Sequence, residues 1–162
     1  MKKIAGKNQI FVLLHNIRST HNVGSIFRTA DALGVDKIYL SGYTPTPIDK
    51  FDKPQKDIAK VSLGAEKTVK WEYVKNPKKV LTEIKKSDAQ IVALEQAGNS
   101  ADYKKVKIKY PVLFLVGNEV GGIEKEILKL CDIVAEIPMA GEKESLNVSV
   151  AFGVGLFGML KI

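Results

Sequence analysis

Both arginines of the chain lie within one short stretch, and an asparagine stands between them. Arg18 and Arg28 are the only arginines among 25 basic residues, and Asn22 lies between the two. A guanidinium is a planar fork that suits phosphate, whereas a lysine ammonium is a point charge. Free backbone N–H groups at the start of a helix also suit a phosphate or a carboxylate. The alternative is structural: Asn22 only caps a helix, and Arg28 pairs with Asp31 on its surface.

A glycine-rich loop is the second candidate for chemistry. An apolar run at residues 112–116 leads into residues 117–122, GNEVGG. Glycine lets the backbone approach a ligand closely. The loop lacks the Lys and Ser/Thr of a phosphate-binding P-loop and the G-x-G-x-x-G spacing of a dinucleotide site. Two interpretations of residues 117–122 therefore stay open: a ligand-binding wall, and an ordinary loop between a strand and a helix.

The third candidate is residues 137–157, IPMAGEKESLNVSVAFGVGLF. Pro138 ends a predicted strand because proline cannot donate to a β-ladder. Ser145 stands where a helix N-cap is expected, and the helix that follows is apolar on nearly every side. Three glycines lie inside it, and each lowers helix propensity by roughly 1 kcal/mol relative to alanine. We expect such a helix to be buried, either in the core or under a second subunit.

Alternating strands and helices are needed to position these three stretches. The predicted strands are residues 10–15, 37–41, 69–74, 90–95, 112–116 and 133–137. Predicted helices begin at Asn22, Pro77, Ile123 and Ser145. Residues 41–60 are predicted to be a loop, and residues 105–110 a half-exposed strand or extended segment. This alternation predicts an α/β fold with a mostly parallel sheet and helices on both faces.

The composition restricts the function classes. The net charge of +7 and the isoelectric point of about 9.4 fit a polyanionic partner. A single cysteine, Cys131, excludes an internal disulfide and a multi-cysteine metal site. The apolar run at residues 10–14 is too short for a signal peptide and lacks a cleavage site, so we expect a cytoplasmic protein. No apolar run reaches the roughly 18 residues that a membrane span needs, so we expect no membrane association.

Taken together, the three stretches resemble the three motifs of the SpoU class of SPOUT methyltransferases, also called the TrmH family. Asn22, Gly24 and Arg28 match motif 1, residues 117–122 match motif 2, and residues 137–157 match motif 3. The motifs stand in family order, and the resemblance extends over about residues 10–160. Enzymes of this family transfer a methyl group from S-adenosylmethionine to a ribose 2′-hydroxyl in RNA.

The resemblance implies an architecture and a partner. It implies a single SPOUT methyltransferase domain over residues 1–162, with no separate RNA-recognition domain. Residues 117–160 would include a segment threaded into a C-terminal trefoil knot, and two chains would form a homodimer. The expected partner is tRNA or rRNA, the expected cofactor is S-adenosylmethionine, and no metal is implied.

The resemblance also implies site residues. The expected catalytic residues are Arg28, Asn22, Glu119, Ser145 and Asn147. The expected cofactor-binding residues are Leu94, Glu95, Gly117, Asn118, Gly122, Ile137, Met139, Leu146 and Asn147. In the family the motif 1 arginine is assigned as the general base, but a charged Arg28 that binds phosphate and stabilises the developing alkoxide is equally open. Two other functions stay open: a catalytically silent RNA-binding protein on the same fold, and an unrelated α/β enzyme that binds a nucleotide cofactor at the loop.

Overall fold

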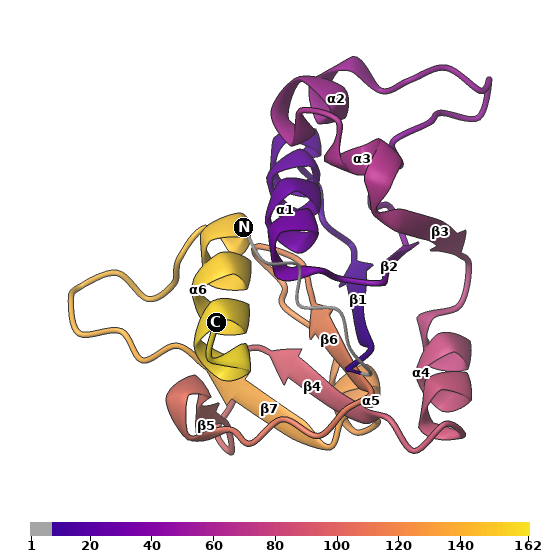
Figure 1. Cartoon of the computed structure of the whole chain (residues 1–162). Coiled ribbons are helices and arrows are strands. Elements are labelled where there is room, and N and C mark those ends of the chain that lie inside the picture. The colour runs from indigo at the N-terminus through magenta and orange to yellow at the C-terminus, as the bar shows by residue number, and fades with distance from the viewer. Residues whose placement is uncertain (1–7) are drawn as a thin grey trace.

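The computed structural model describes residues 8–162, in which seven parallel strands form one sheet (Figure 1). Across the sheet the strand order is β3-β2-β1-β6-β4-β7-β5. The strands are β1 (Ile10–His15), β2 (Lys37–Ser41), β3 (Lys70–Val74), β4 (Gln90–Leu94), β5 (Ala101–Asp102), β6 (Val112–Val116) and β7 (Ile133–Glu136). Every strand pairing is parallel, which confirms the predicted α/β fold class.

Helices cover both faces of the sheet. One face packs against α1 (Thr20–Leu33), α2 (Lys56–Ser62), α3 (Ala65–Thr68) and α6 (Val148–Leu160). The opposite face packs against α4 (Pro77–Lys85) and α5 (Lys125–Leu128). A short 3-10 helix, η1 (Tyr103–Lys105), follows β5. The sheet therefore separates two apolar layers, as its continuous hydrophobic strands require.

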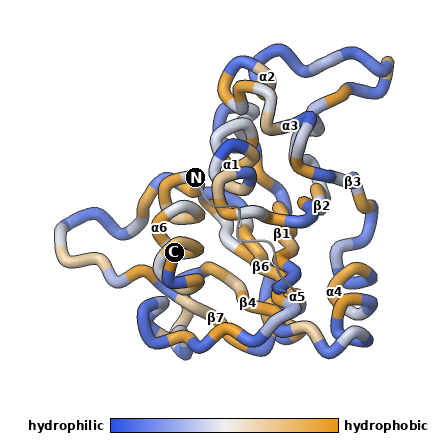
Figure 2. Tube along the Cα trace, in the orientation of Figure 1, coloured by the Kyte–Doolittle hydropathy of each residue, from blue (hydrophilic) through white to orange (hydrophobic). Residues whose placement is uncertain are grey.

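The three central strands, β1, β4 and β6, bring the loops of interest to one edge. All five residues of β6 are buried, and β1, β4 and β6 are hydrophobic in Figure 2. In the register, Val116 at the end of β6 lies beside both Leu14 of β1 and Leu94 of β4. The carboxyl ends of these strands therefore lie together. Ligands bind at this edge in open α/β sheets.

Two helix starts differ from the predictions. Ser19, and not Asn22, is the N-cap of α1, because the Ser19 side chain accepts a hydrogen bond from the Asn22 backbone N–H at 3.2 Å. Asn147, and not Ser145, is the N-cap of α6, and its Oδ1 accepts from the Ser149 N–H at 2.9 Å. In both cases another capping residue stands nearby in the sequence, so composition alone could not choose between them.

Gly24 does not serve a phosphate-binding helix start, because it lies inside α1 and is buried. A Cβ at Gly24 would lie 2.9 Å from both the Ile58 carbonyl oxygen and the Val61 Cβ of α2. Glycine is needed here for the close approach of two helices. The predicted loop at residues 41–60 is wrong at its end, because α2 begins just after Pro54, which is compatible with the start of a helix but not its interior.

Other predicted segments are placed as follows. The helix expected from Ile123 begins at Lys125 and is one turn long. Residues 106–110 join no β-ladder, so the extended alternative applies and the strand alternative is wrong. The trefoil knot over residues 117–160 stays a prediction, because strand order describes pairing and does not describe threading.

Candidate functional site

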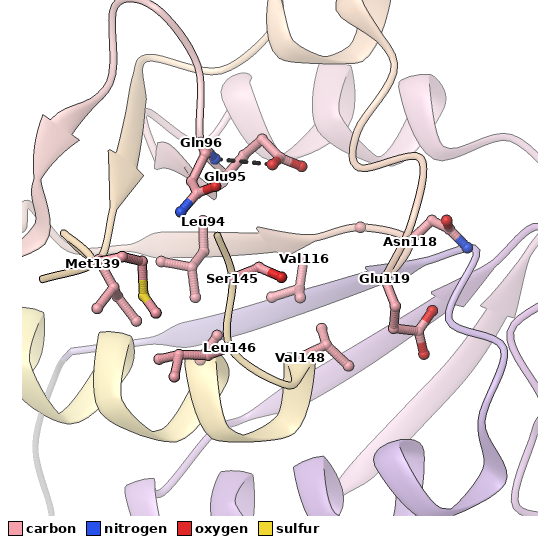
Figure 3. A pocket seen from close by; sticks show the side chains of 13 residues that line it. Leu94, Glu95, Gln96, Val116, Asn118, Glu119, Met139, Ser145, Leu146 and Val148 are labelled. Atoms are coloured by element: carbon pink, nitrogen blue, oxygen red, sulfur yellow. Dashed lines mark hydrogen bonds between the residues drawn. The ribbon is translucent and has the colours of Figure 1, made fainter. Parts of the chain in front are cut away.

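A cavity lies at the carboxyl ends of β4 and β6, beside the start of α6 (Figure 3). The cavity is open to solvent on one side. Apolar side chains make up most of its walls, with a few polar groups among them. The lining residues are Leu94, Glu95, Gln96, Val116, Gly117, Asn118, Glu119, Ile137, Met139, Ser145, Leu146, Val148 and Ala151.

The glycine-rich loop can approach the cavity only because it carries no side chain at two positions. A Cβ at Gly117 would lie 2.4 Å from Ile123 Cγ1 and 2.9 Å from the Gly122 carbonyl oxygen. Gly122 has a φ of +66°, in the left-handed region, and a Cβ there would lie 2.6 Å from Glu95 Oε2. The loop therefore folds back tightly on itself directly after β6.

Glu95 secures this loop from the neighbouring strand end. Its carboxylate accepts a hydrogen bond from the Ile123 N–H at 2.9 Å and another from the Gln96 N–H at 2.9 Å, drawn as a dashed line in Figure 3. The carboxylate is thus engaged by the loop. Of the two strand-end residues expected to bind the cofactor, Leu94 contributes its side chain to the apolar wall, and Glu95 sets the loop in place.

Three polar side chains, one from each motif, are joined by hydrogen bonds, and one of them, Glu119, lines the cavity. Asn22 Nδ2 donates to Glu119 Oε1 at 3.1 Å, and Asn147 Nδ2 donates to Asn22 Oδ1 at 3.1 Å. We call Glu119, Asn22 and Asn147 the polar chain. Glu119 Oε2 also accepts from the Arg18 backbone N–H at 3.3 Å. Both ends of the Asn22 amide are therefore committed, which fixes its orientation.

Arg28 lies on α1 and is exposed. Within residues 8–162 it forms neither an ion pair nor a side-chain hydrogen bond, so the surface pair with Asp31 that the spacing allowed is not formed. Asp31 instead accepts a hydrogen bond from the Thr68 hydroxyl at 2.7 Å. The guanidinium is left available to an anionic ligand.

Most, though not all, of the expected site residues line the cavity. Those that do are Leu94, Glu95, Gly117, Asn118, Glu119, Ile137, Met139, Ser145 and Leu146. Gly122 and Asn147 do not line it, although both were expected to bind the cofactor. Gly122 instead shapes the loop, and Asn147 caps α6 and joins the polar chain. Arg28 and Asn22 also lie outside the cavity walls.

Four lining residues were missed by the sequence analysis: Gln96, Val116, Val148 and Ala151. Val116 could have been found, because a parallel register places it beside Leu94. Val148 and Ala151 are one helical turn apart in α6, a spacing that puts them on one face. Gln96 gave no signal beyond its place after Glu95.

Two further properties bear on chemistry. Among residues 8–162, no three His, Cys, Asp or Glu side chains gather as a metal site would, and no helix is long and apolar enough to cross a membrane. Cys131 is half-buried, and burial raises the pKa of its thiol to about 12. The thiol therefore remains protonated at neutral pH, which makes it a poor nucleophile.

Known proteins match the chain over nearly all of its length. The model of the SpoU rRNA Methylase family matches residues 9–157. A tRNA (guanosine(18)-2′-O)-methyltransferase of Aquifex aeolicus is 35% identical over 97% of this chain and 72% of its own length. The 23S rRNA (guanosine-2′-O-)-methyltransferase RlmB of Xylella fastidiosa is 34% identical over 94% of this chain, which spans only 59% of that relative.

Solved structures share the fold. The crystal structure of an AdoMet-bound rRNA methyltransferase from Sinorhizobium meliloti has a TM-score of 0.83 and 29% identity, covering 96% of this chain and 57% of the other. The Aquifex aeolicus TrmH/SpoU tRNA modifying enzyme has a TM-score of 0.82 and 34% identity, covering 96% of this chain and 75% of the other.

Proposed function

The chain belongs to the SpoU rRNA methylase family, and on that premise we propose that it transfers a methyl group from S-adenosylmethionine to a ribose 2′-hydroxyl of tRNA or rRNA. One observation carries the proposal: the polar chain joins a residue of each motif, and its member Glu119 lines the apolar cavity. Adjacent apolar and polar sites are what a reaction between an adenosyl cofactor and a ribose requires.

The cavity fits S-adenosylmethionine. Leu94, Ile137 and Leu146 offer apolar surface for an adenine ring, and the tight loop at Gly117 exposes backbone near them. S-adenosylmethionine supplies an activated methyl group on its sulfonium sulfur. Glu119 lines the same cavity and carries a carboxylate that favours a nearby positive charge.

The polar chain would position the ribose. Asn22 is held from both sides, by Glu119 and by Asn147, so its orientation is fixed beside a carboxylate that lines the cavity. Fixed groups of this kind convert a collision between two reactants into a reaction within one complex. In the transfer, the 2′-oxygen would bond to the methyl carbon as the bond from that carbon to the sulfonium sulfur breaks, and the hydroxyl proton would pass to water.

Arg28 has two candidate roles, and we favour the electrostatic one. The guanidinium is exposed and has no acidic partner within residues 8–162 that would occupy it. Guanidinium groups keep their protons in proteins. A charged Arg28 would bind a phosphate next to the target ribose and stabilise the developing alkoxide. Arg28→Lys would then lose the planar fork and most of the activity.

The first experiment measures transfer from methyl-labelled S-adenosylmethionine to unfractionated tRNA and rRNA, followed by nucleoside analysis. A 2′-O-methylnucleoside made by the wild type and absent with Arg28→Ala is expected. Lys78→Ala serves as the matched control, because Lys78 is an exposed cation on α4. A base-methylated product, or no binding of S-adenosylmethionine at all, would contradict the proposal. Binding of RNA without any binding of S-adenosylmethionine would favour the silent RNA-binding alternative.

We further propose that two copies form a homodimer through α6. Val150, Val154 and Phe157 recur at helical spacing, are 49%, 41% and 36% exposed, and form an apolar stripe on the side of α6 away from the sheet. A second copy would bury this stripe, which accounts for a helix that is apolar on every side. We also propose a trefoil knot over residues 117–160 and a cytoplasmic location.

We also propose that the chain acts as one domain over residues 1–162 and that exposed lysines take part in RNA docking. Lys50, Lys53, Lys56 and Lys60 are all exposed. They lie on the long segment between β2 and α2, which projects from the body of the molecule in Figure 1, and on α2 itself. We call these four residues the lysine rim. Solvated lysines attract a phosphate backbone without reading its sequence.

A further inference from the structure

A second hollow adjoins the cavity, and its lining is Arg18, Tyr43 and Asn118. Asn118 lines both spaces, and its amide points away from Met139 and Leu146 in Figure 3. The Arg18 backbone N–H donates to Glu119, so the hollow begins beside the polar chain. A nucleotide with its ribose at the polar chain thus has this hollow within reach of its base and phosphate.

Tyr43 is held at two points, yet its ring is exposed to solvent. Its backbone N–H donates to Asn16 Oδ1 at 3.2 Å, and its phenol oxygen accepts from Asn118 Nδ2 at 2.6 Å. The residue is nevertheless 57% exposed. Two anchors on an exposed aromatic mean that little side-chain entropy is lost when a flat ligand stacks on it. A ring of this kind suits an unpaired nucleobase.

The turn that carries Tyr43 is built to hold it there. Gly42 has a φ of +66°, and a Cβ at that position would lie 1.8 Å from Asn16 Oδ1. Asn16 itself has a φ of +59° and donates through Nδ2 to Glu124 Oε1 at 3.3 Å. Any side chain at position 42 would displace the Asn16 amide. The turn therefore fixes the ring relative to the loop after β6.

Arg18 supplies the charge of the hollow. It is exposed, and within residues 8–162 its guanidinium has neither an ion-pair partner nor a hydrogen-bond acceptor. Its backbone is held by Glu119, so the side chain extends from a fixed point. A guanidinium in that setting binds phosphate oxygens in a bidentate manner.

We propose that Arg18 and Tyr43 form a nucleotide subsite, in which the Tyr43 ring stacks on the base of the methylated nucleotide and Arg18 binds its phosphate. The subsite rests on the proposed function, because it takes the RNA strand as its ligand. It stands apart from the cofactor cavity, which neither residue lines. The subsite selects an unstacked nucleotide, since a base inside a helix could not reach the ring.

The test compares full-length Tyr43→Leu, Tyr43→Phe and Arg18→Ala with the wild type, using unfractionated tRNA and rRNA as substrates. Tyr43→Leu should raise KM for RNA about tenfold, as expected for one lost stacking contact, with little change in the dissociation constant of S-adenosylmethionine. Tyr43→Phe keeps the ring and should stay within about threefold of the wild type. Arg18→Ala should lower the slope of log RNA affinity against log salt concentration by about one, the equivalent of one lost phosphate contact.

Tyr73→Leu is the matched control, because Tyr73 is also exposed and donates its hydroxyl to the Gly42 carbonyl oxygen at 3.0 Å. If Tyr43→Leu and Tyr73→Leu raise KM for RNA equally, the turn has only a structural role and the proposed subsite is wrong. If the wild type methylates neither RNA, the proposed function fails separately. Binding of a fluorescein-labelled single-stranded 12-nucleotide RNA then decides the subsite: weaker binding by Tyr43→Leu supports it, and unchanged binding refutes it.

Discussion

The cavity and the polar chain meet at Glu119, but they are built by different means. The cavity walls are backbone and apolar side chains at the ends of buried strands, where the sheet fixes their positions. The polar chain depends on side-chain amides that join residues 97 and 125 positions apart. Apolar walls tolerate similar side chains, whereas an amide pair does not. Cofactor binding and methyl transfer should therefore separate under mutation.

The largest expected effect comes from the tight loop that belongs to the cavity. In Gly117→Val the new side chain would begin 2.4 Å from Ile123 Cγ1 and 2.9 Å from the Gly122 carbonyl oxygen, so the loop must move. We expect binding of S-adenosylmethionine to fall below detection in calorimetry, with a loss of about 1–3 kcal/mol in the free energy of unfolding.

Gly121→Ala is the control for that loop, since the nearest atom to its Cβ would be Asn118 Oδ1 at 3.4 Å and its φ is not in the left-handed region. Its affinity for S-adenosylmethionine should stay close to that of the wild type. If both glycine variants bind equally well, close packing of the loop does not shape the cofactor site.

Asn147 has two roles, and two substitutions separate them. Asn147→Ser keeps a capping oxygen for the Ser149 N–H but removes the Nδ2 that donates to Asn22. Asn147→Ala removes both, and capping loss costs about 1 kcal/mol. Both variants should lose about tenfold or more in the single-turnover rate, while only Asn147→Ala should lower the melting temperature. A normal rate in Asn147→Ser would show that the polar chain is structural only.

The apolar stripe on α6 belongs to neither the cavity nor the polar chain. Val154→Lys with Phe157→Lys places charges where a second copy is proposed to pack. We expect a monomer in analytical ultracentrifugation. Binding of S-adenosylmethionine should persist, because neither Val154 nor Phe157 lines the cavity. Lys78→Ala with Lys86→Ala, two exposed positions in and directly after α4, should leave the oligomeric state unchanged. A dimeric double-lysine variant would contradict the α6 interface.

The smallest effect is expected at the lysine rim, which lies outside both regions. Substituting Lys50, Lys53 and Lys56 by alanine removes three exposed charges. RNA affinity at low salt should fall, with a salt slope lower by roughly two, and the single-turnover rate at saturating RNA should not change. Unchanged affinity at low salt would remove the rim from RNA docking. The triple variant Lys78→Ala, Lys86→Ala and Lys107→Ala supplies the matched loss of charge.

Sequence reasoning found the sheet and most of the cavity because both follow from local patterns. Apolar runs predicted β1, β4 and β6, and the parallel sheet brings their ends together. It assigned the wrong cap to two helices, Asn22 to α1 and Ser145 to α6, because capping is a short-range choice and Ser19 and Asn147 were equally good caps. The hydrogen bonds from Asn22 to Glu119 and Asn147 link distant positions, and no local pattern encodes them. The Gly24 contact with α2 was missed in the same way.

The most direct test of the account measures two quantities on Asn22→Ala: the dissociation constant of S-adenosylmethionine and the single-turnover rate of methyl transfer to RNA. Asn22 does not line the cavity but holds the polar chain together. The account predicts that the rate falls by about 100-fold, the scale of a misplaced reactant, while the dissociation constant stays within about threefold. A rate that is unchanged, or a cofactor affinity that falls in the same proportion as the rate, would contradict it.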